Sequence, residues 1–166
     1  MTHRMIFFPI ILLSTIVFAQ NDNSTLKGKA ATAADKIESK CIEWRRDFHQ
    51  HPELGNNEKR TAAIVTAHLK KLGIETKEGV GKTGVVGVMK NGPGPVILFR
   101  GDMDALPVKE ETGLSYASTK TGTTLDGIKS PITHACGHDA HVTWLIGVAK
   151  VMAAQKANWS GTLILV

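Results

Sequence analysis

Apolar residues along the chain repeat with two different spacings, and the change of spacing predicts alternating helices and strands. Apolar residues at three- and four-residue intervals are typical of helices packed on one side, whereas short, mainly apolar runs are typical of buried strands. This alternation favours the α/β class, with a layered sheet flanked by helices. The expected helices cover residues 35–51, 57–72 and 139–154, and the expected strands cover residues 74–77, 84–89, 96–100 and 162–166.

Polar and small residues set the expected boundaries of these elements. Asp35 and Asn57 are the expected N-caps of the first two helices. The run Asn91-Gly92-Pro93-Gly94-Pro95 has the chemistry of a turn and predicts a hairpin-like connection between the strands on either side of it. Residues 114–132 have few periodic apolar positions and are expected to form a surface excursion. The last strand, residues 162–166, is expected to leave one edge unpaired, which favours aggregation.

The first residues have the pattern of a secretory signal. Arg4 supplies a positive start, residues 6–18 form an apolar stretch, and Ala19 ends a small-residue pattern typical of a cleavage site. The stretch is shorter than the ~20 apolar residues of a comfortable membrane span, so no stable span is expected; an uncleaved N-terminal anchor is the alternative. We predict a signal peptide at residues 1–19, a flexible leader at residues 20–34, and export to the periplasm or the medium.

Composition narrows the class of protein. The chain has 166 residues, 42% of them hydrophobic, and a formal charge of +5, which is the balance of a globular domain. The positive charges are scattered and no basic block is interleaved with aromatic residues, so no nucleic-acid partner is expected. Cys41 and Cys136 are the two cysteines. A disulfide between them is compatible with export, and metal binding by Cys136 is the alternative.

Two carboxylates follow the strand expected at residues 96–100. Asp102 and Asp104 have the spacing that places two side chains on one face of an extended backbone. Strand ends in open α/β sheets are where ligands bind, and carboxylates there can ligate a cation or orient a ligating imidazole. The alternative is a solvated acidic turn closed by Pro107.

A denser cluster of metal-ligating side chains opens the helix expected at residues 139–154. Cys136 and His138 flank a single glycine, and thiolate with imidazole suits zinc and related metals. His141 lies one helical turn beyond His138, and Asp139 sits at the helix start, where negative charge is favoured. A capped helix start with solvated histidines is the alternative. The whole stretch reads His134-Ala135-Cys136-Gly137-His138-Asp139-Ala140-His141.

These residues do not make a complete catalytic site. Zinc takes about four ligands, or three and a water, and Cys136 and His138 supply two. Hydrolysis by a metal-activated water also needs a general base. The last glutamate, Glu111, precedes the cluster. The residues themselves leave both a hydrolase and a metal-binding or interaction module open.

Three stretches together are similar to a known family. Residues Arg46–Leu54, Gly101–Pro107 and His134–Asp139 resemble, in this order, three signature stretches of the M20 peptidase family. The resemblance is to its amidohydrolase branch, which includes hippurate hydrolases, N-acyl-amino-acid amidohydrolases and auxin-conjugate hydrolases. It covers roughly residues 40–166.

The resemblance implies a role for several residues. Cys136 and His138 match metal-ligand positions of this branch, and Asp104 matches the catalytic aspartate that orients or polarises the site. Asp102 stands where other branches carry a ligand histidine. His141 and Asp139 are expected to line the site. The family has an α/β metal-binding catalytic domain, and residues 35–166 are expected to be its N-terminal portion, without the smaller dimerisation domain that makes a homodimer.

The implied activity is hydrolysis of the amide bond of N-acyl amino acids or similar small conjugates. The implied cofactors are divalent ions, two per full-length subunit, with zinc, manganese, cobalt and nickel all open. By resemblance, a pair of glutamates, one of them the general base, is expected directly after Val166. The chain alone is therefore expected to be inactive, and an inactive remnant or a metal-binding module is the alternative.

Overall fold

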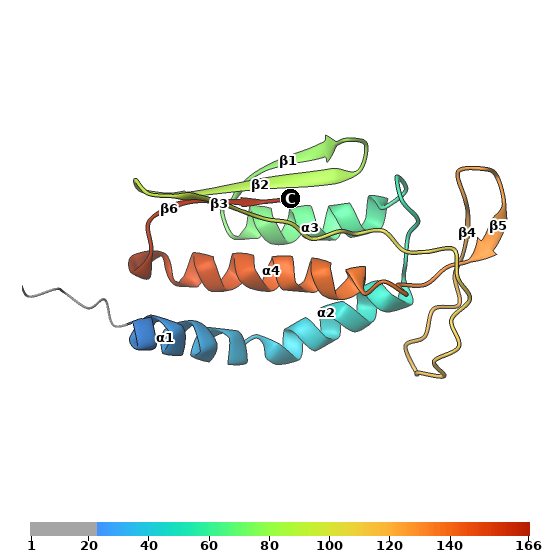
Figure 1. Cartoon of the computed structure of the whole chain (residues 1–166), viewed down its shortest axis with the longest axis horizontal. Coiled ribbons are helices and arrows are strands. Elements are labelled where there is room, and N and C mark those ends of the chain that lie inside the picture. The colour runs from blue at the N-terminus through green and yellow to red at the C-terminus, as the bar shows by residue number, and fades with distance from the viewer. Residues whose placement is uncertain (1–22) are drawn as a thin grey trace, which may run out of the picture.

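The computed structural model describes residues 23–166, which form a sheet with helices layered beneath it (Figure 1). The α/β class predicted from the sequence is confirmed. The helices are α1 (Asn23–Asp35), α2 (Glu38–Gln50), α3 (Lys59–Lys71) and α4 (His138–Ala154), with a short 3-10 turn at Lys156–Asn158. The strands are β1 (Glu75–Val80), β2 (Gly84–Asn91), β3 (Val96–Phe99), β4 (Thr121–Thr123), β5 (Lys129–Pro131) and β6 (Gly161–Leu165).

The main sheet has the order β1-β2-β6-β3. β2 runs antiparallel to both β1 and β6, and β3 runs parallel to β6, with α4 in the connection between them. The predicted hairpin across residues 91–95 is therefore wrong, because β6 lies between β2 and β3. The side chain of Asn91 donates to the carbonyls of Lys156 and Trp159, at 2.8 and 2.5 Å, and so ties this turn to the start of β6.

The expectation of an unpaired edge on the last strand is also wrong. β6 is paired along both sides, so its apolar residues lie in the centre of the sheet. The edges of the sheet are β1 and β3. Both strands expected on either side of the turn were placed correctly in the sequence, but their pairing depends on a strand that follows some 60 residues later.

The hydrophobic core lies between the sheet and the helices. α3 packs on β1 and β2, and α2, α1 and α3 each pack on α4 (Figure 1). Residues of β2 and β6 alternate between buried and half-buried, which is the pattern of strands with one face on a core. Phe48, Leu69, Ile146 and Leu165 are the largest fully buried apolar side chains of this core.

The N-terminal part differs from the prediction. Residues 23–34, expected within a flexible leader, belong to α1, which packs along α4. α2 begins at Glu38 rather than at Asp35, because Asp35 closes α1. The predicted signal peptide at residues 1–19 lies outside the described residues. No helix within residues 23–166 is long and apolar enough to cross a membrane.

The start of α3 is held by a residue from the preceding loop. The predicted cap, Asn57, is exposed and makes no capping bond, whereas the Glu53 carboxylate accepts from the backbone N–H groups of Arg60 and Thr61 at 2.9 and 2.8 Å. It also accepts from the Thr61 hydroxyl at 2.9 Å. Unpaired N–H groups at a helix start need such acceptors, and a carboxylate also matches the positive end of the helix dipole.

Residues 114–132 are largely exposed, as predicted, but they contain the small β4–β5 hairpin. Ile132 at its end is buried, and Thr133 pairs with Leu106. The excursion is thereby attached to the loop that follows β3.

Glu53→Ala is expected to lower the free energy of unfolding by about 1–2 kcal/mol, because it removes the acceptor of the first α3 amides. Glu43→Ala is the control, since Glu43 makes one exposed ion pair with Lys40 and should change the free energy by less than about 0.5 kcal/mol. Urea denaturation followed by circular dichroism measures both. Equal effects of the two substitutions would contradict this assignment.

Candidate metal centre

The loop after β3 is positioned by the stretch Arg46–Leu54 and by Thr133, the residue directly before the stretch His134–Asp139. The N–H of Ala105 donates to the carbonyl of Glu53 at 2.8 Å, and Leu54 pairs with Ala105 in an isolated bridge. On the other side, Leu106 and Thr133 exchange backbone hydrogen bonds at 3.0 and 3.1 Å. The loop that carries Asp102 and Asp104 is therefore fixed between the segment after α2 and the segment before α4.

Gly101 lets this loop approach the first turns of α4. A Cβ atom at Gly101 would lie 2.9 Å from the carbonyl oxygen of His141 and 3.3 Å from the Cβ of Leu145, so a larger residue would push the loop off the helix. The Gly101 N–H donates to the Val166 carbonyl at 2.8 Å and continues the pairing of β3 with β6. As a result, the residue after Gly101, Asp102, lies beside α4.

Asp104 orients His138. The Nδ1 of His138 lies 2.9 Å from both the backbone oxygen and the Oδ1 of Asp104. Two acceptors at one ring nitrogen place the proton on Nδ1 and leave the Nε2 lone pair available. Histidines that bind metals almost always donate their other N–H to a carboxylate or carbonyl in this way. The predicted orienting role of Asp104 is consistent with this arrangement.

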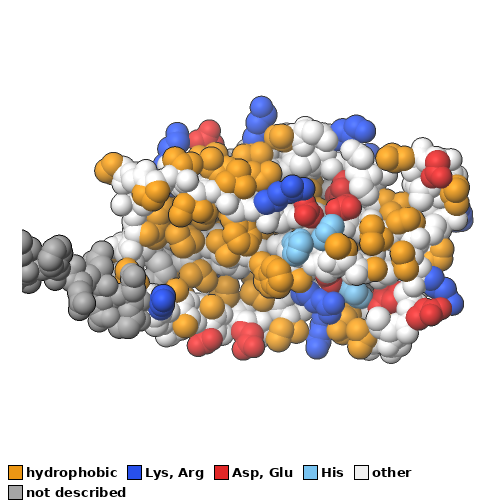
Figure 2. Space-filling model, viewed as in Figure 1, with side chains coloured by type: hydrophobic (Ala, Val, Ile, Leu, Met, Phe, Trp, Pro, Cys, Tyr) orange, Lys and Arg blue, Asp and Glu red, His pale blue; other side chains and the backbone are white. Residues whose placement is uncertain are grey.

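The structure brings three of the predicted site residues together. In the part of the chain that the structure describes, Asp102, His138 and His141 form the group whose potential ligand atoms all lie within 4.8 Å of one another. The rings of His138 and His141 stack with centroids 5.0 Å apart, and His141 Nδ1 lies 4.0 Å from Asp102 Oδ2. Figure 2 shows histidine side chains beside acidic and basic ones at the centre of this face.

Cys136 lies outside that group. Its side chain is exposed, both cysteines are free, and so the alternative of a disulfide with Cys41 is not formed in this structure. Gly137, between Cys136 and His138, adopts a left-handed conformation with φ of 78° directly before α4. A metal-ligand role for Cys136 stays a prediction.

His134 is a buried histidine with no hydrogen-bond partner in the structure. The residue is 5% exposed, and neither Nδ1 nor Nε2 is paired. Burial lowers the pKa of His134 to about 4, against the opposing charge of Asp139. A pKa of about 4 keeps the ring neutral at physiological pH.

Asp139 does not line the group of three residues. Its carboxylate is fully buried and lies 2.7 Å from His49 Nδ1 and 2.8 Å from Arg45 Nε. The other ring nitrogen of His49 lies 2.9 Å from Glu110 Oε1. A buried network thus joins α2, the first turn of α4 and the loop after β3, and we call these four residues, Arg45, His49, Glu110 and Asp139, the His49 network.

Glu110 is the most heavily hydrogen-bonded carboxylate of this network. Besides His49, it accepts from the hydroxyls of Thr112 and Thr133 and from the Ser118 N–H. Burial alone would raise the pKa of Glu110, but these hydrogen bonds outweigh it and hold the pKa at about 2. The charged form therefore fastens the excursion at residues 114–132 to α2.

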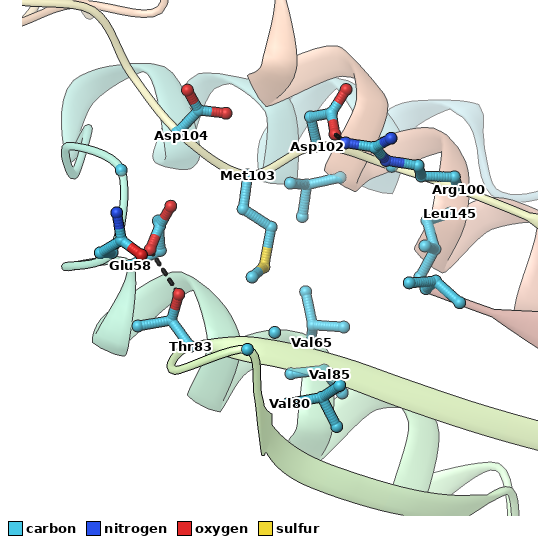
Figure 3. A pocket seen from close by; sticks show the side chains of 17 residues that line it. Glu58, Val65, Val80, Thr83, Val85, Arg100, Asp102, Met103, Asp104 and Leu145 are labelled. Atoms are coloured by element: carbon cyan, nitrogen blue, oxygen red, sulfur yellow. Dashed lines mark hydrogen bonds and ion pairs between the residues drawn. The ribbon is translucent and has the colours of Figure 1, made fainter.

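A pocket of about 310 Å³ lies beside Asp102 and Asp104, at the carboxyl ends of β3 and β6. Met103 points into it, between Glu58 on one side and Leu145 on the other (Figure 3). Glu58 is 7% exposed and accepts a hydrogen bond of 2.5 Å from the Thr83 hydroxyl. Sequence reasoning missed this third carboxylate, because Glu58 stands in a polar stretch that resembles a solvated helix start.

Comparison with known proteins matches the chain to one family model. The model of peptidase family M20/M25/M40 matches residues 98–166, which include the loop after β3 and all of α4. A hippurate hydrolase from Campylobacter jejuni is 46% identical over 115 residues, which are 69% of this chain and 28% of the relative. The chain belongs to the M20 peptidase family.

Other proteins similar to this M20 chain support its membership of the family. Thermostable carboxypeptidase 1 from Saccharolobus solfataricus is 41% identical over 133 residues, covering 79% of this chain and 32% of the relative. Among solved structures, a dinuclear metal-binding M20 peptidase from Bacillus subtilis matches 79% of this chain and 35% of its own, with a TM-score of 0.68 and 35% identity. The chain spans about a third of the length of the relatives it matches.

Glu110→Gln is expected to lower the free energy of unfolding at pH 7. It should also make that free energy depend less on pH between 4.5 and 2. The folded pKa of about 2 lies below the ordinary value of 4.5, so the unfolded chain binds the proton first. The stabilisation is complete above pH 4.5 and is lost as the pH falls toward 2. The wild type and Glu110→Gln should therefore converge across that window.

Glu111→Gln is the matched control for this titration. Glu111 is the next residue, with its side chain 78% exposed and a 3.4 Å ion pair to Lys109. Its pH profile should follow that of the wild type. Denaturation in urea between pH 2 and 7 measures all three proteins, and a wild-type profile that stays parallel to that of Glu110→Gln would overturn the assignment.

Proposed function

We propose that this chain supplies part of the metal site of an amidohydrolase that cleaves the amide bond of N-acyl amino acids or similar small conjugates. The observation that carries the proposal is the orientation of His138 by Asp104, beside Asp102 and His141. Two imidazoles and a carboxylate suit zinc, manganese, cobalt or nickel. The Bacillus subtilis relative is a dinuclear metal-binding peptidase, which supports two ions in the complete protein.

His138 is the residue that the structure prepares best to hold a metal. Its Nδ1 proton is shared with Asp104, so the Nε2 lone pair is directed to the site and the ring cannot rotate freely. Asp102 and His141 supply the further donors, with Cys136 as a fourth candidate on the adjoining turn. A bound divalent cation would polarise the scissile carbonyl and lower the pKa of water at the site.

The pocket beside these residues has both an apolar and a polar part. Met103, Val65, Val85 and Leu145 supply apolar lining, and Glu58, Asp102 and Asp104 supply carboxylates. An apolar substituent there would leave the adjoining amide near the proposed ligands. The names of the hippurate hydrolase and of the plant IAA-amino acid hydrolases support an N-acyl amino acid as the substrate class.

We propose that residues 23–166 alone bind metal but do not complete the reaction. A general base needs a carboxylate free to take a proton from water. In the described part of the chain, the carboxylates of this pocket are engaged: Asp102 with Arg100 at 2.6 Å, Asp104 with His138, and Glu58 with Thr83. The expected glutamate pair of the family would supply the base. Export through residues 1–19 is part of the same proposal.

Titration of the chain with Co²⁺ tests the metal site. Wild type is expected to bind the ion, His138→Ala to lose binding, and Asp104→Ala to bind about 10–100-fold more weakly, because the orienting acceptor is gone. His51→Ala is the control, since this histidine hydrogen-bonds the Asp47 carbonyl and is not among the grouped potential ligands. Visible absorption of Co²⁺ and calorimetry measure the binding.

The same titration tests whether Cys136 is a metal ligand. A separate activity assay tests whether the chain alone is inactive. A sulfur-to-cobalt charge-transfer band that disappears in Cys136→Ser would establish the thiolate as a ligand. Equal weakening by His51→Ala and His138→Ala would rule out the proposed site. Hydrolysis of hippurate by the 166-residue chain, followed by glycine release, is expected to be absent, and measurable turnover would contradict the need for a further base.

A further inference from the structure

The turn at residues 134–137, which we call the Cys136 turn, has few hydrogen bonds of its own. The Gly137 N–H donates to the His134 carbonyl at 3.2 Å, and both ring nitrogens of His134 are unpaired. α4 begins directly after the turn, at His138, without a side-chain cap. The position of the turn and of the first residue of α4 therefore depends on the segments on either side.

Glu110 holds the segments on both sides of the Cys136 turn. Before the turn, the Thr133 hydroxyl donates to Glu110 Oε2 at 3.1 Å. After the turn, Asp139 Oδ2 lies 2.7 Å from His49 Nδ1, and the other ring nitrogen of His49 lies 2.9 Å from Glu110 Oε1. The two oxygens of one carboxylate thus bracket the turn, one of them directly and the other through His49.

This bracket is buried among residues that the structure describes. The side chains of His49, Glu110 and Asp139 are 7%, 2% and 0% exposed, and all of the partners lie between residues 45 and 139. Buried carboxylates need charged or hydrogen-bonding partners, and the loss of one partner leaves the others uncompensated. A change at Glu110 is therefore expected to shift both ends of the Cys136 turn.

Glu110 also ties the excursion at residues 114–132 to the same bracket. The Ser118 N–H donates to Glu110 Oε2 at 2.5 Å. Tyr116, the single tyrosine of the chain, packs edge-on against His49 with ring centroids 5.6 Å apart, and its hydroxyl accepts from Arg45 at 3.1 Å. Docking of the excursion on α2 and placement of the Cys136 turn thus share one carboxylate.

We propose that Glu110 is a positioning residue for the metal site, and that a metal ion bound at His138 in return holds the excursion on α2. This inference rests on the proposed metal-binding function. Glu110 acts on His138 through His49 and Asp139, and on the Cys136 turn through Thr133. Coupling between two sites is reciprocal, so docking that strengthens metal binding must itself be strengthened by the metal.

Co²⁺ titration of variants tests the positioning role. Glu110→Gln and Thr133→Val are each expected to weaken binding about 3–10-fold, a typical size for coupling through packed networks. Thr133→Ser keeps the hydroxyl and should bind like the wild type. Glu111→Gln is the charge control, since its carboxylate is exposed. Ile74→Val is the stability control, because it removes one methylene from the core between α3 and β2 and should leave the affinity unchanged.

Trypsin digestion with and without Co²⁺ tests the reciprocal effect. Lys120 and Lys129 are exposed in the excursion, beside β4 and in β5. Saturating Co²⁺ should slow cleavage after these lysines about threefold or more in the wild type, because the excursion opens less often. The ion should have no effect in His138→Ala. Glu110→Gln should be cleaved faster without the ion and be less protected by it. Mass spectrometry identifies the cleaved bonds, and circular dichroism checks that each variant folds.

The outcomes separate this inference from the proposed function. Binding that is lost in His138→Ala but unchanged in Glu110→Gln would keep the metal site and overturn the positioning role. Weakening by Ile74→Val as large as that by Glu110→Gln would reveal a general effect of stability and overturn the role as well. Cleavage of the wild-type excursion at the same rate with and without Co²⁺ would overturn the reciprocal effect. A wild type that binds no Co²⁺ would overturn both the inference and the proposed function.

Discussion

The carboxylate of Asp139 is the buried charge on which the geometry of the site depends. It is fully buried at the first turn of α4, directly after His138, and it pairs with His49 and Arg45 of α2. A carboxylate in such a place is tolerated only with charged partners and hydrogen bonds, and removal of one partner leaves the other uncompensated. The first turn of α4 therefore has one position against α2, and His138 is carried with it.

His138 is consequently fixed from two sides by different means. The backbone beneath it is held by the His49 network, and its ring is held by Asp104 on the loop after β3. That loop is held in turn by Glu53 and Leu54, which follow α2. One helix and the few residues after it thus support both halves of the site. The stretch around His49 therefore supports the candidate site, although it contributes no residue to the group of three.

The periodicity of the sequence was sufficient to locate most elements, because helices and strands with one buried face leave a local pattern. It could not give the order β1-β2-β6-β3, since the neighbour of β3 lies about 60 residues further along the chain. The residues of the candidate site also divide into those with a local signal in the sequence and those without one. Asp102, Asp104, His138 and His141 were identified from residue type and spacing, whereas Glu58 and the partners of Asp139 depend on contacts between distant segments. Nothing local distinguishes His49, which is buried between two carboxylates, from the half-exposed His51.

The position of the site and the exposure of β3 have a common origin in this topology. β3 runs parallel to β6, so its carboxyl end, where Asp102 and Asp104 begin, opens at the same edge of the sheet as Val166. A parallel pair needs a crossover, and α4 supplies it while also presenting His138 and His141. The crossover packs near Phe99 at the end of β3 but does not cover the free edge of the strand. A strand that is apolar enough to sit beside β6 in the interior therefore keeps Val96, Ile97 and Leu98 exposed until another strand pairs with it.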